Sequence, residues 1–175
     1  AEDKADFDRI LKYQAERTAE ECERAAFVVD VKLDTLFGPK NGPLTAAEVE
    51  RWSNFFGKIR IDTDYFVQET KKHWGRLRPY LNDKRVEPCV HREVTKAYPS
   101  GHAAISRTFA RILTKLDPSR AEAFDKRADE IAEHRVLAGV HHPTDIEAGK
   151  KLGDQVFEAL IKNKAFVKSL ETLAQ

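Results

Sequence analysis

The sequence predicts an all-α protein that folds as a single compact helical bundle. Apolar residues recur mostly at spacings of three and four, and the alternating Val, Ile and Thr pattern of β-strands is scarce. With 175 residues, the chain is long enough for one domain to bury a sizeable core. We therefore expect helices, no sheet, and one domain over residues 1–175.

The first part of the chain contains a charged amphipathic stretch and then a longer helix. The amphipathic stretch covers residues 5–29, and the glycines and prolines of residues 37–43 interrupt the pattern. The run from Thr45 to Glu48 has the Thr-x-x-Glu form of a capping box, which marks a helix start. This helix is expected to continue, with or without a bend, to about Trp74, and Gly75 is a suitable end.

The remainder of the chain reads as a long connection followed by helices. Residues 76–99 contain three prolines and no clear periodicity, which indicates an irregular segment of the kind that often carries function. Ser100 and the Asp117-Pro118 pair are expected to cap the helices that follow them. The expected helices cover residues 100–116, 117–139 and 143–160, and a short C-terminal helix follows.

Charge and hydropathy exclude two classes of partner. Lys and Arg number 30 against 29 Asp and Glu, so the net charge of +1 gives no reason to expect binding to nucleic acid or to an anionic membrane. The longest stretch without a charged side chain runs from Ala97 to Ser106, about half of the roughly 20 residues that cross a bilayer. We therefore expect no membrane span.

The cysteines and the start of the sequence bear on cellular compartment. Cys22 and Cys89 are the only cysteines, which excludes a Cys-rich zinc site and leaves either two buried thiols or one disulfide. Their spacing does not choose between these states. The sequence begins Ala-Glu-Asp, has no apolar leader and contains no Met, as expected of an exported protein after signal-peptide cleavage or of a trimmed chain.

The segment Tyr98-Pro99-Ser100-Gly101-His102 places a small turn at a helix start. Free backbone N–H groups and the helix dipole favour an anion there, and Gly101 lets an oxyanion approach the backbone. Taken alone, the segment is better explained by Ser100 as a helix cap and His102 as a satisfied side chain of the first turn.

A second segment places His141 just before a helix and Asp145 in the first turn of that helix. An aspartate that accepts a hydrogen bond from one imidazole nitrogen fixes the tautomer and leaves the lone pair of the other nitrogen free to attack. An aspartate that only stabilises the helix start, beside a loop histidine, explains this segment about equally well.

Lys71, Arg78 and Arg135 are candidate anion-binding residues, although surface charge is the default interpretation of cations in such a charged chain. A phosphate monoester needs several fixed positive donors, because its transfer depends on positioning and on stabilising three equatorial oxygens. These three side chains would supply them.

Taken in order, these segments resemble the type-2 phosphatidic acid phosphatase superfamily, to which the vanadium haloperoxidases are similar. The family pattern is Lys-x6-Arg-Pro, Pro-Ser-Gly-His and Ser-Arg-x5-His-x3-Asp, and it matches residues 71–79, 99–102 and 135–145. Local phrases such as Pro88-Cys89 are most similar to the class A bacterial non-specific acid phosphatases. His134 stands at the serine position of the pattern, which leaves open whether this position still donates to phosphate.

The resemblance implies an all-α, exported acid phosphatase of the periplasm or the cell exterior. It implies hydrolysis of many phosphate monoesters without a metal or other cofactor, and binding of phosphate or vanadate. His141 would attack phosphorus to form a phosphohistidine, Asp145 would orient it, and His102 would act as general acid and then as base. The implied phosphate-binding residues are Lys71, Arg78, Ser100, Gly101, His102, Arg135 and His141. The oligomeric state, including a homo-oligomer, stays open, as do the physiological ester and phosphotransfer to alcohols.

Two histidines beside a cationic pocket agree physically with an in-line displacement in two steps, and predict a bell-shaped pH profile on the acidic side of neutral. A zinc site built from His134, His141 and His142 lacks a recognised ligand spacing. Two alternatives remain: a vanadate-dependent haloperoxidase, disfavoured by the short chain, and a helical module that binds phosphate without turnover. Trp74 and Tyr80 are expected to pack in the core or loops, near enough to line a substrate entrance.

Overall fold

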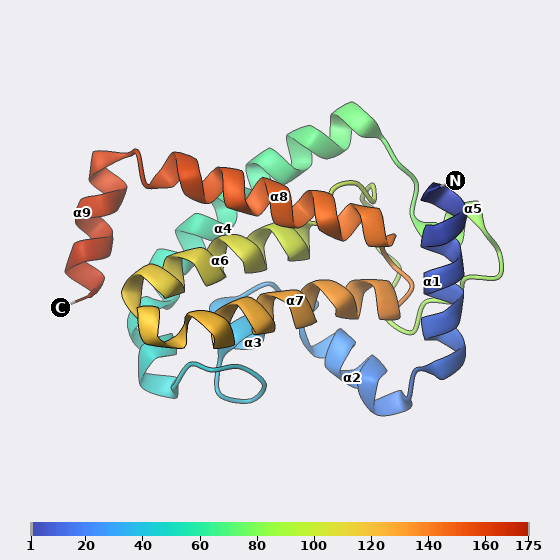
Figure 1. The fold of residues 1–175 in the computed structure, drawn as a ribbon, viewed down its shortest axis with the longest axis horizontal. Helices are drawn as coiled ribbons and strands as arrows, with labels where there is room; N and C mark the ends of the chain where they lie inside the picture. Colours follow the sequence, from blue (N-terminus) through green and yellow to red (C-terminus); the bar gives the residue numbers. More distant parts are fainter. Residues whose placement is uncertain (1, 175) are drawn as a thin grey trace.

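The computed structural model describes residues 2–174, and within this range it contains helices and no strand, which confirms the all-α fold class (Figure 1). The helices are α1 (Glu2–Glu16), α2 (Ala19–Phe27), α3 (Leu33–Phe37), α4 (Ala46–Trp74), α5 (Pro79–Asn82), α6 (Gly101–Leu116), the 3-10 turn η1 (Pro118–Arg120), α7 (Ala121–Leu137), α8 (Pro143–Leu160) and α9 (Lys164–Leu173). In residues 2–174, no helix has the length and apolar character needed to cross a bilayer.

Helix α6 lies at the centre of the bundle. It packs against α4, α7 and α8, while α1 crosses the end of the bundle where α7 stops and α8 starts (Figure 1). The main core lies between these helices and includes the buried rings of Phe56 and Phe109, which meet edge to face with centroids 4.8 Å apart. A second, smaller core under α1 includes Ile10, Val136 and Ile146.

The helix boundaries differ from the expected ones mainly near the N-terminus. The amphipathic stretch of residues 5–29 is divided into two helices because Thr18 begins α2 with a capping box: the Glu21 carboxylate accepts from the Thr18 N–H at 2.7 Å, and the Thr18 hydroxyl accepts from the Glu21 N–H. The short helices α3 and α5 were not expected, because four or five residues are too few to show a helical period.

Helix α4 agrees with the sequence prediction. Thr45 and Glu48 form the expected capping box, and the helix continues to Trp74. Gly75 ends it in the left-handed conformation, with φ of 60°, which only glycine adopts without strain. Because Lys71 lies in the last turn, this end of the helix places the Lys71 side chain beside the chain that follows.

Two glycines let α8 lie unusually close to α6. A Cβ atom at Gly149 would stand 2.5 Å from the Ser100 carbonyl oxygen, and one at Gly153 would stand 2.5 Å from the Ala104 carbonyl oxygen. The Ser100 N–H in turn donates to the carbonyl oxygen of Asp145 at 2.9 Å. The N-terminal turns of α6 and α8 are therefore held together by close backbone packing and a direct hydrogen bond.

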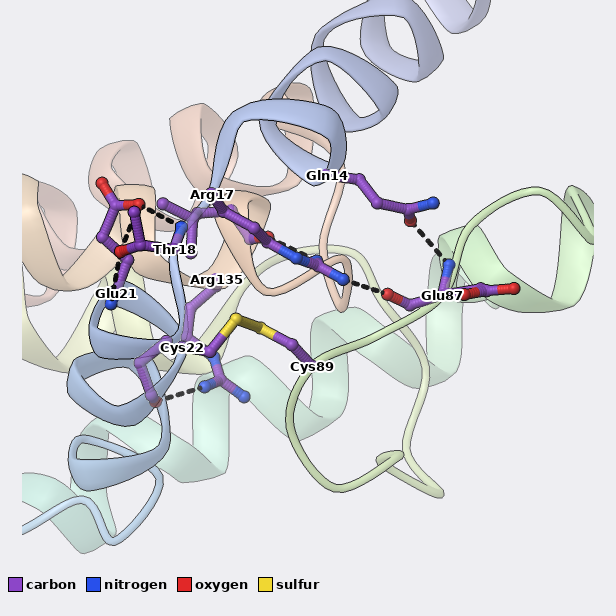
Figure 2. Close-up of a disulfide and its surroundings, with 10 residues drawn as sticks. Gln14, Arg17, Thr18, Glu21, Cys22, Glu87, Cys89 and Arg135 are labelled. Atoms are coloured by element: carbon purple, nitrogen blue, oxygen red, sulfur yellow. Dashed lines mark hydrogen bonds between the residues drawn. A yellow bond between two sulfur atoms is a disulfide. The ribbon is translucent and has the colours of Figure 1, made fainter.

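Figure 2 shows a disulfide between Cys22 of α2 and Cys89 of the irregular segment that precedes α6. The sequence had left the state of these cysteines open. The Arg17 guanidinium supports the same junction: Nη2 donates to the Glu87 carbonyl oxygen at 2.6 Å, and Nη1 donates to the Leu137 carbonyl oxygen at 2.8 Å. The irregular segment is thus attached both to α2 and to the end of α7.

We predict that Gly149→Ala destabilises the protein by about 1–3 kcal/mol, because the added methyl group forces α8 away from α6. Gly57→Ala is the matched control, since a Cβ atom at this position in α4 would meet nothing within 4 Å. It should stabilise the protein by up to about 1 kcal/mol through helix propensity. Urea unfolding of both variants measures the difference, and equal stabilities would contradict this packing.

Reduction of the disulfide should lower the free energy of unfolding by roughly 4 kcal/mol, because the bridge joins residues separated by 67 positions and limits the unfolded chain. Urea unfolding with and without a thiol reductant measures this loss. The Cys22→Ala/Cys89→Ala variant should match the reduced protein and should not respond to reductant. A reductant effect that persists in this variant would show that the loss has another cause.

Candidate active site

The residues singled out from the sequence come together at the end of the bundle near α1. The last turn of α4, the segment after it, the start of α6, the end of α7 and the start of α8 meet there. The residues placed by these elements are Lys71, Arg78, Ser100, Gly101, His102, Arg135, His141 and Asp145.

Lys71 and Arg78 are buried cations that donate hydrogen bonds to the same piece of loop, residues 95–96. The Lys71 ammonium donates to the Lys96 carbonyl oxygen at 2.7 Å, and Arg78 Nε donates to the Thr95 carbonyl oxygen at 2.8 Å. The Lys71 ammonium and Arg78 Nη2 also donate to the Thr95 hydroxyl oxygen, at 3.3 and 2.9 Å respectively. Burial, with the nearby charge of Arg78, lowers the pKa of Lys71 to about 8.

Arg135 is the most completely buried cation of the cluster. Its Nη1 donates to the Ala25 carbonyl oxygen at 3.3 Å, and its Nη2 faces a Glu93 carboxylate oxygen at 3.4 Å. Figure 2 shows that Arg135 lies beside the disulfide. Nε is buried without a hydrogen-bond partner, and burial lowers the pKa of the guanidinium to about 10. A buried donor without an acceptor is unfavourable, so an anion bound here would be stabilised.

The contacts of His141 define its tautomer. Its Nδ1 lies 3.3 Å from Asp145 Oδ2, and its Nε2 lies 2.8 Å from Arg78 Nη1. An ionised carboxylate only accepts and a guanidinium only donates, so Nδ1 carries the proton and Nε2 carries the lone pair. Burial and the charge of Arg78 hold the pKa of His141 well below its usual range, which keeps the ring neutral.

Asp145 is fully buried and accepts hydrogen bonds from several directions. Besides His141, the backbone N–H and Nδ1 of His142 donate to Oδ2 at 2.8 and 2.9 Å. Arg76 Nη1 donates to Oδ1 at 2.8 Å. Burial alone would raise the pKa of this carboxyl, but the hydrogen bonds from His141 and His142 hold it well below its usual range. Asp145 is therefore an ionised, acceptor-only group.

His102 lies in the first turn of α6, which Ser100 caps through a 3.4 Å hydrogen bond from the Ala103 N–H. Its Nε2 is buried without a partner, like Nε of Arg135. Burial and the charge of Arg135 lower the pKa of His102 well below its usual range. The cluster thus combines a second neutral imidazole with the unsatisfied Nε donor of Arg135, which favours the arrival of an anion.

Several contacting residues were not expected from the sequence. Arg76 and His142 both donate to Asp145, and Glu93 faces Arg135. In the sequence, Arg76 and Glu93 are not distinguishable from surface charges, because the partner of each lies in another segment, and His142 is not distinguishable from an ordinary loop histidine. The Lys-x6-Arg spacing gives no role to an intervening arginine, so no pattern could have identified Arg76.

Other residues considered in the sequence lie outside the cluster. His134 lines a groove between α1, α2 and α7 together with Tyr13 and Arg24, and none of Lys71, Arg78 and Arg135 lines this groove. Tyr80 is buried and donates to the Glu93 carbonyl oxygen at 2.7 Å. Trp74 is exposed and meets the Tyr98 ring edge to face at 5.7 Å, beside the groove that Arg76 lines.

No sequence-family model matches the chain. A non-specific acid phosphatase of Salmonella typhi is 29% identical over 163 residues, which cover 91% of this chain and 63% of that protein. A non-specific acid phosphatase of Providencia stuartii is 26% identical, with 90% of this chain and 64% of that protein covered. The chain therefore spans less than two thirds of the length of these relatives.

Solved structures extend the comparison to the fold. A transmembrane PAP2-type phosphatidylglycerolphosphate phosphatase from Bacillus subtilis superposes with a TM-score of 0.63 and 20% identity, covering 90% of this chain and 83% of that one. At this identity the similarity establishes the fold alone. The chain is similar in sequence to non-specific acid phosphatases and has the all-α fold of the PAP2-type phosphatase structure.

Proposed function

We propose that this protein is an acid phosphatase that hydrolyses phosphate monoesters through a phosphohistidine on His141, without a metal ion. The observation that carries the proposal is the His141 ring, whose Nδ1–H is held by Asp145 and whose Nε2 lone pair is turned toward Arg78. A neutral imidazole with a defined lone pair among fixed cations is suited to attack a phosphate ester.

In the first step, Nε2 of His141 attacks phosphorus, and the bond from phosphorus to the ester oxygen breaks. Arg78 Nη1 donates to Nε2 at 2.8 Å, so it must transfer this hydrogen bond to a phosphoryl oxygen as substrate binds. The charge that develops on the histidine is balanced by Asp145. The products of this step are the phosphohistidine and the leaving alcohol.

His102 is proposed to protonate the leaving oxygen. Burial and the charge of Arg135 lower the pKa of this histidine, and the negative charge of a bound phosphate ester opposes that shift. His102 therefore takes up its proton as the ester binds, which is favoured at acidic pH. After the alcohol leaves, neutral His102 accepts a proton from the water that hydrolyses the phosphohistidine.

The transferring phosphoryl group is proposed to lie among Lys71, Arg78 and Arg135, with Ser100 and the Gly101 N–H as further donors. Buried, pre-positioned cations stabilise developing charge more strongly than solvated ones and need no reorganisation during the reaction. Because these donors bind only the phosphoryl group, we propose that the protein accepts a broad range of phosphate esters as substrates. Inorganic phosphate and vanadate should compete with them for the site.

We also propose that the protein acts in the periplasm or outside the cell. The Cys22–Cys89 disulfide supports this location, because structural disulfides persist in oxidising compartments.

The first test compares His141→Ala and His102→Ala on two esters that differ in leaving group. His141→Ala should lose activity on both by at least about a thousandfold, because nothing replaces the attacking nitrogen. His102→Ala should lose about 10²–10⁴-fold on an alkyl phosphate and much less on p-nitrophenyl phosphate, whose leaving group needs little protonation. Steady-state kinetics in the presence of a chelator measure both.

Exposed His73 provides the control, and His73→Ala should keep full activity. Equal losses of His102→Ala on the two esters would contradict the general-acid role, and an active His141→Ala would contradict the nucleophile.

The affinity for inorganic phosphate should fall as pH rises through about 8, because Lys71 carries its charge below this pKa and loses it above. The competitive inhibition constant of phosphate should rise by up to roughly tenfold per pH unit beyond this point. In Lys71→Arg, whose guanidinium stays charged, this rise should disappear up to the pKa of about 10 of Arg135. The same pH dependence in both proteins would exclude Lys71 as its origin.

A further inference from the structure

The guanidinium of Arg76 links Asp145 to the N-terminal helix. Arg76 follows Gly75, the left-handed residue that ends α4. Its Nη1 donates to Asp145 Oδ1 at 2.8 Å and to the Thr144 hydroxyl at 2.6 Å. Its Nη2 donates to Asp6 Oδ2 at 3.0 Å and to Asp3 Oδ1 at 2.9 Å, both on α1.

The two oxygens of Asp145 face different groups. Oδ2 accepts hydrogen bonds from Nδ1 of His141 and from the backbone N–H and Nδ1 of His142. Oδ1 accepts a hydrogen bond from Arg76. Asp145 is fully buried, so water does not replace a missing donor easily. Without Arg76, the carboxylate would be free to rotate, and Oδ1 would compete with Oδ2 for the imidazole protons.

We propose that Arg76, held in place by Asp6 of α1, is a positioning residue that fixes the plane of the Asp145 carboxylate and thereby the hydrogen bond that orients Nδ1–H of His141. This inference rests on the proposed function, since it assigns a role in the same reaction. It also makes α1, whose sequence matches none of the three family segments, part of the support for the nucleophile.

The two aspartates of α1 contact the same nitrogen of Arg76 in different surroundings. The Asp6 side chain is 4% exposed and also accepts from the Thr144 N–H at 3.2 Å, whereas the Asp3 side chain is 83% exposed. A solvated ion pair contributes little, because water screens it. Asp6 therefore holds the guanidinium, and Asp3 adds little.

The position of Arg76 allows it to orient Asp145 without contact to the bound phosphoryl group. Its donors face Asp145, Thr144 and the α1 carboxylates, on the side of the Asp145 carboxylate away from Oδ2 and His141. Loss of Arg76 should therefore slow the chemical step and leave the binding of phosphate unchanged. A residue that bound the phosphoryl group would change KM and the inhibition constants instead.

Arg76 also borders a surface groove of about 630 Å³, together with Trp74, Tyr98 and Lys151, and its side chain is 22% exposed. Truncation to alanine would open the space of the guanidinium to this groove. A small soluble guanidinium ion can then enter and donate to Asp145 Oδ1, which allows chemical rescue.

The test is the kinetics of Arg76→Ala with and without methylguanidinium. We expect kcat to fall about 10–100-fold, which is the usual loss when a group that orients a functional side chain is removed. KM and the inhibition constant of vanadate should change less than threefold, and millimolar methylguanidinium should restore at least a tenth of kcat. Lys151→Ala, an exposed cation of the same groove, should show neither the loss nor the rescue.

A second pair of variants tests the role of α1. Asp6→Asn keeps the shape of the side chain and removes one acceptor, so it should lower kcat about tenfold at unchanged KM, whereas Asp3→Asn should stay within twofold. Equal effects of the two variants would overturn the assignment to Asp6. A kcat of Arg76→Ala equal to wild type, or a raised KM without a loss of kcat, would overturn the role of Arg76.

Imidazole nitrogen NMR of protein labelled with 15N-histidine provides a readout that needs no turnover. In wild type the Nδ1–H proton of His141 should give the downfield signal of a hydrogen bond to a carboxylate, and in Arg76→Ala this signal should move upfield or be lost to exchange with water. Unchanged signals would overturn the inference even if kcat fell. A wild-type protein that gives this downfield signal but has no phosphatase activity would refute the proposed function and leave the positioning role standing.

Discussion

The buried carboxylate of Asp145 is the constraint on which the rest of the site depends. A carboxylate removed from water is strongly unfavourable unless donors surround it. Here the donors come from Arg76, His141 and His142, while the Asp145 backbone oxygen accepts from the Ser100 N–H. Satisfying one ionised group therefore ties together the segment after α4, the connection from α7 to α8, and the first turns of α6 and α8.

The buried cations of the site are subject to the same cost of removing a charge from water as Asp145, with the opposite charge. Lys71, Arg78 and Arg135 are buried where ionised side chains are costly, and burial lowers the pKa of each. Loop carbonyl oxygens satisfy Lys71 and Arg78, but Nε of Arg135 and Nε2 of His102 stay without partners. In the proposed reaction, a phosphoryl oxygen accepts from Nε of Arg135, and Nε2 of His102 binds the proton that it gives to the leaving oxygen. Substrate binding thus satisfies a buried donor.

Much of the fold could be predicted from local sequence, and the contacts around the site could not. Helical periodicity and the Thr45 capping box predicted α4 and the later helices, and the spacing of His141 and Asp145 allowed them to meet. Thr18 was missed as a second helix start within one amphipathic stretch. The pairing of Arg76 with Asp6, 70 residues apart, and the closure of the Cys22–Cys89 disulfide depend on tertiary packing, which spacing alone does not encode.

The most direct test of the central claim is to trap the phosphoenzyme. Rapid quenching at alkaline pH, where phosphohistidine is stable, followed by peptide mass spectrometry locates the phosphoryl group. We predict a single modified residue, His141, phosphorylated at a rate no slower than turnover. Phosphate on any other side chain, or turnover without a covalent phosphoenzyme, would contradict it.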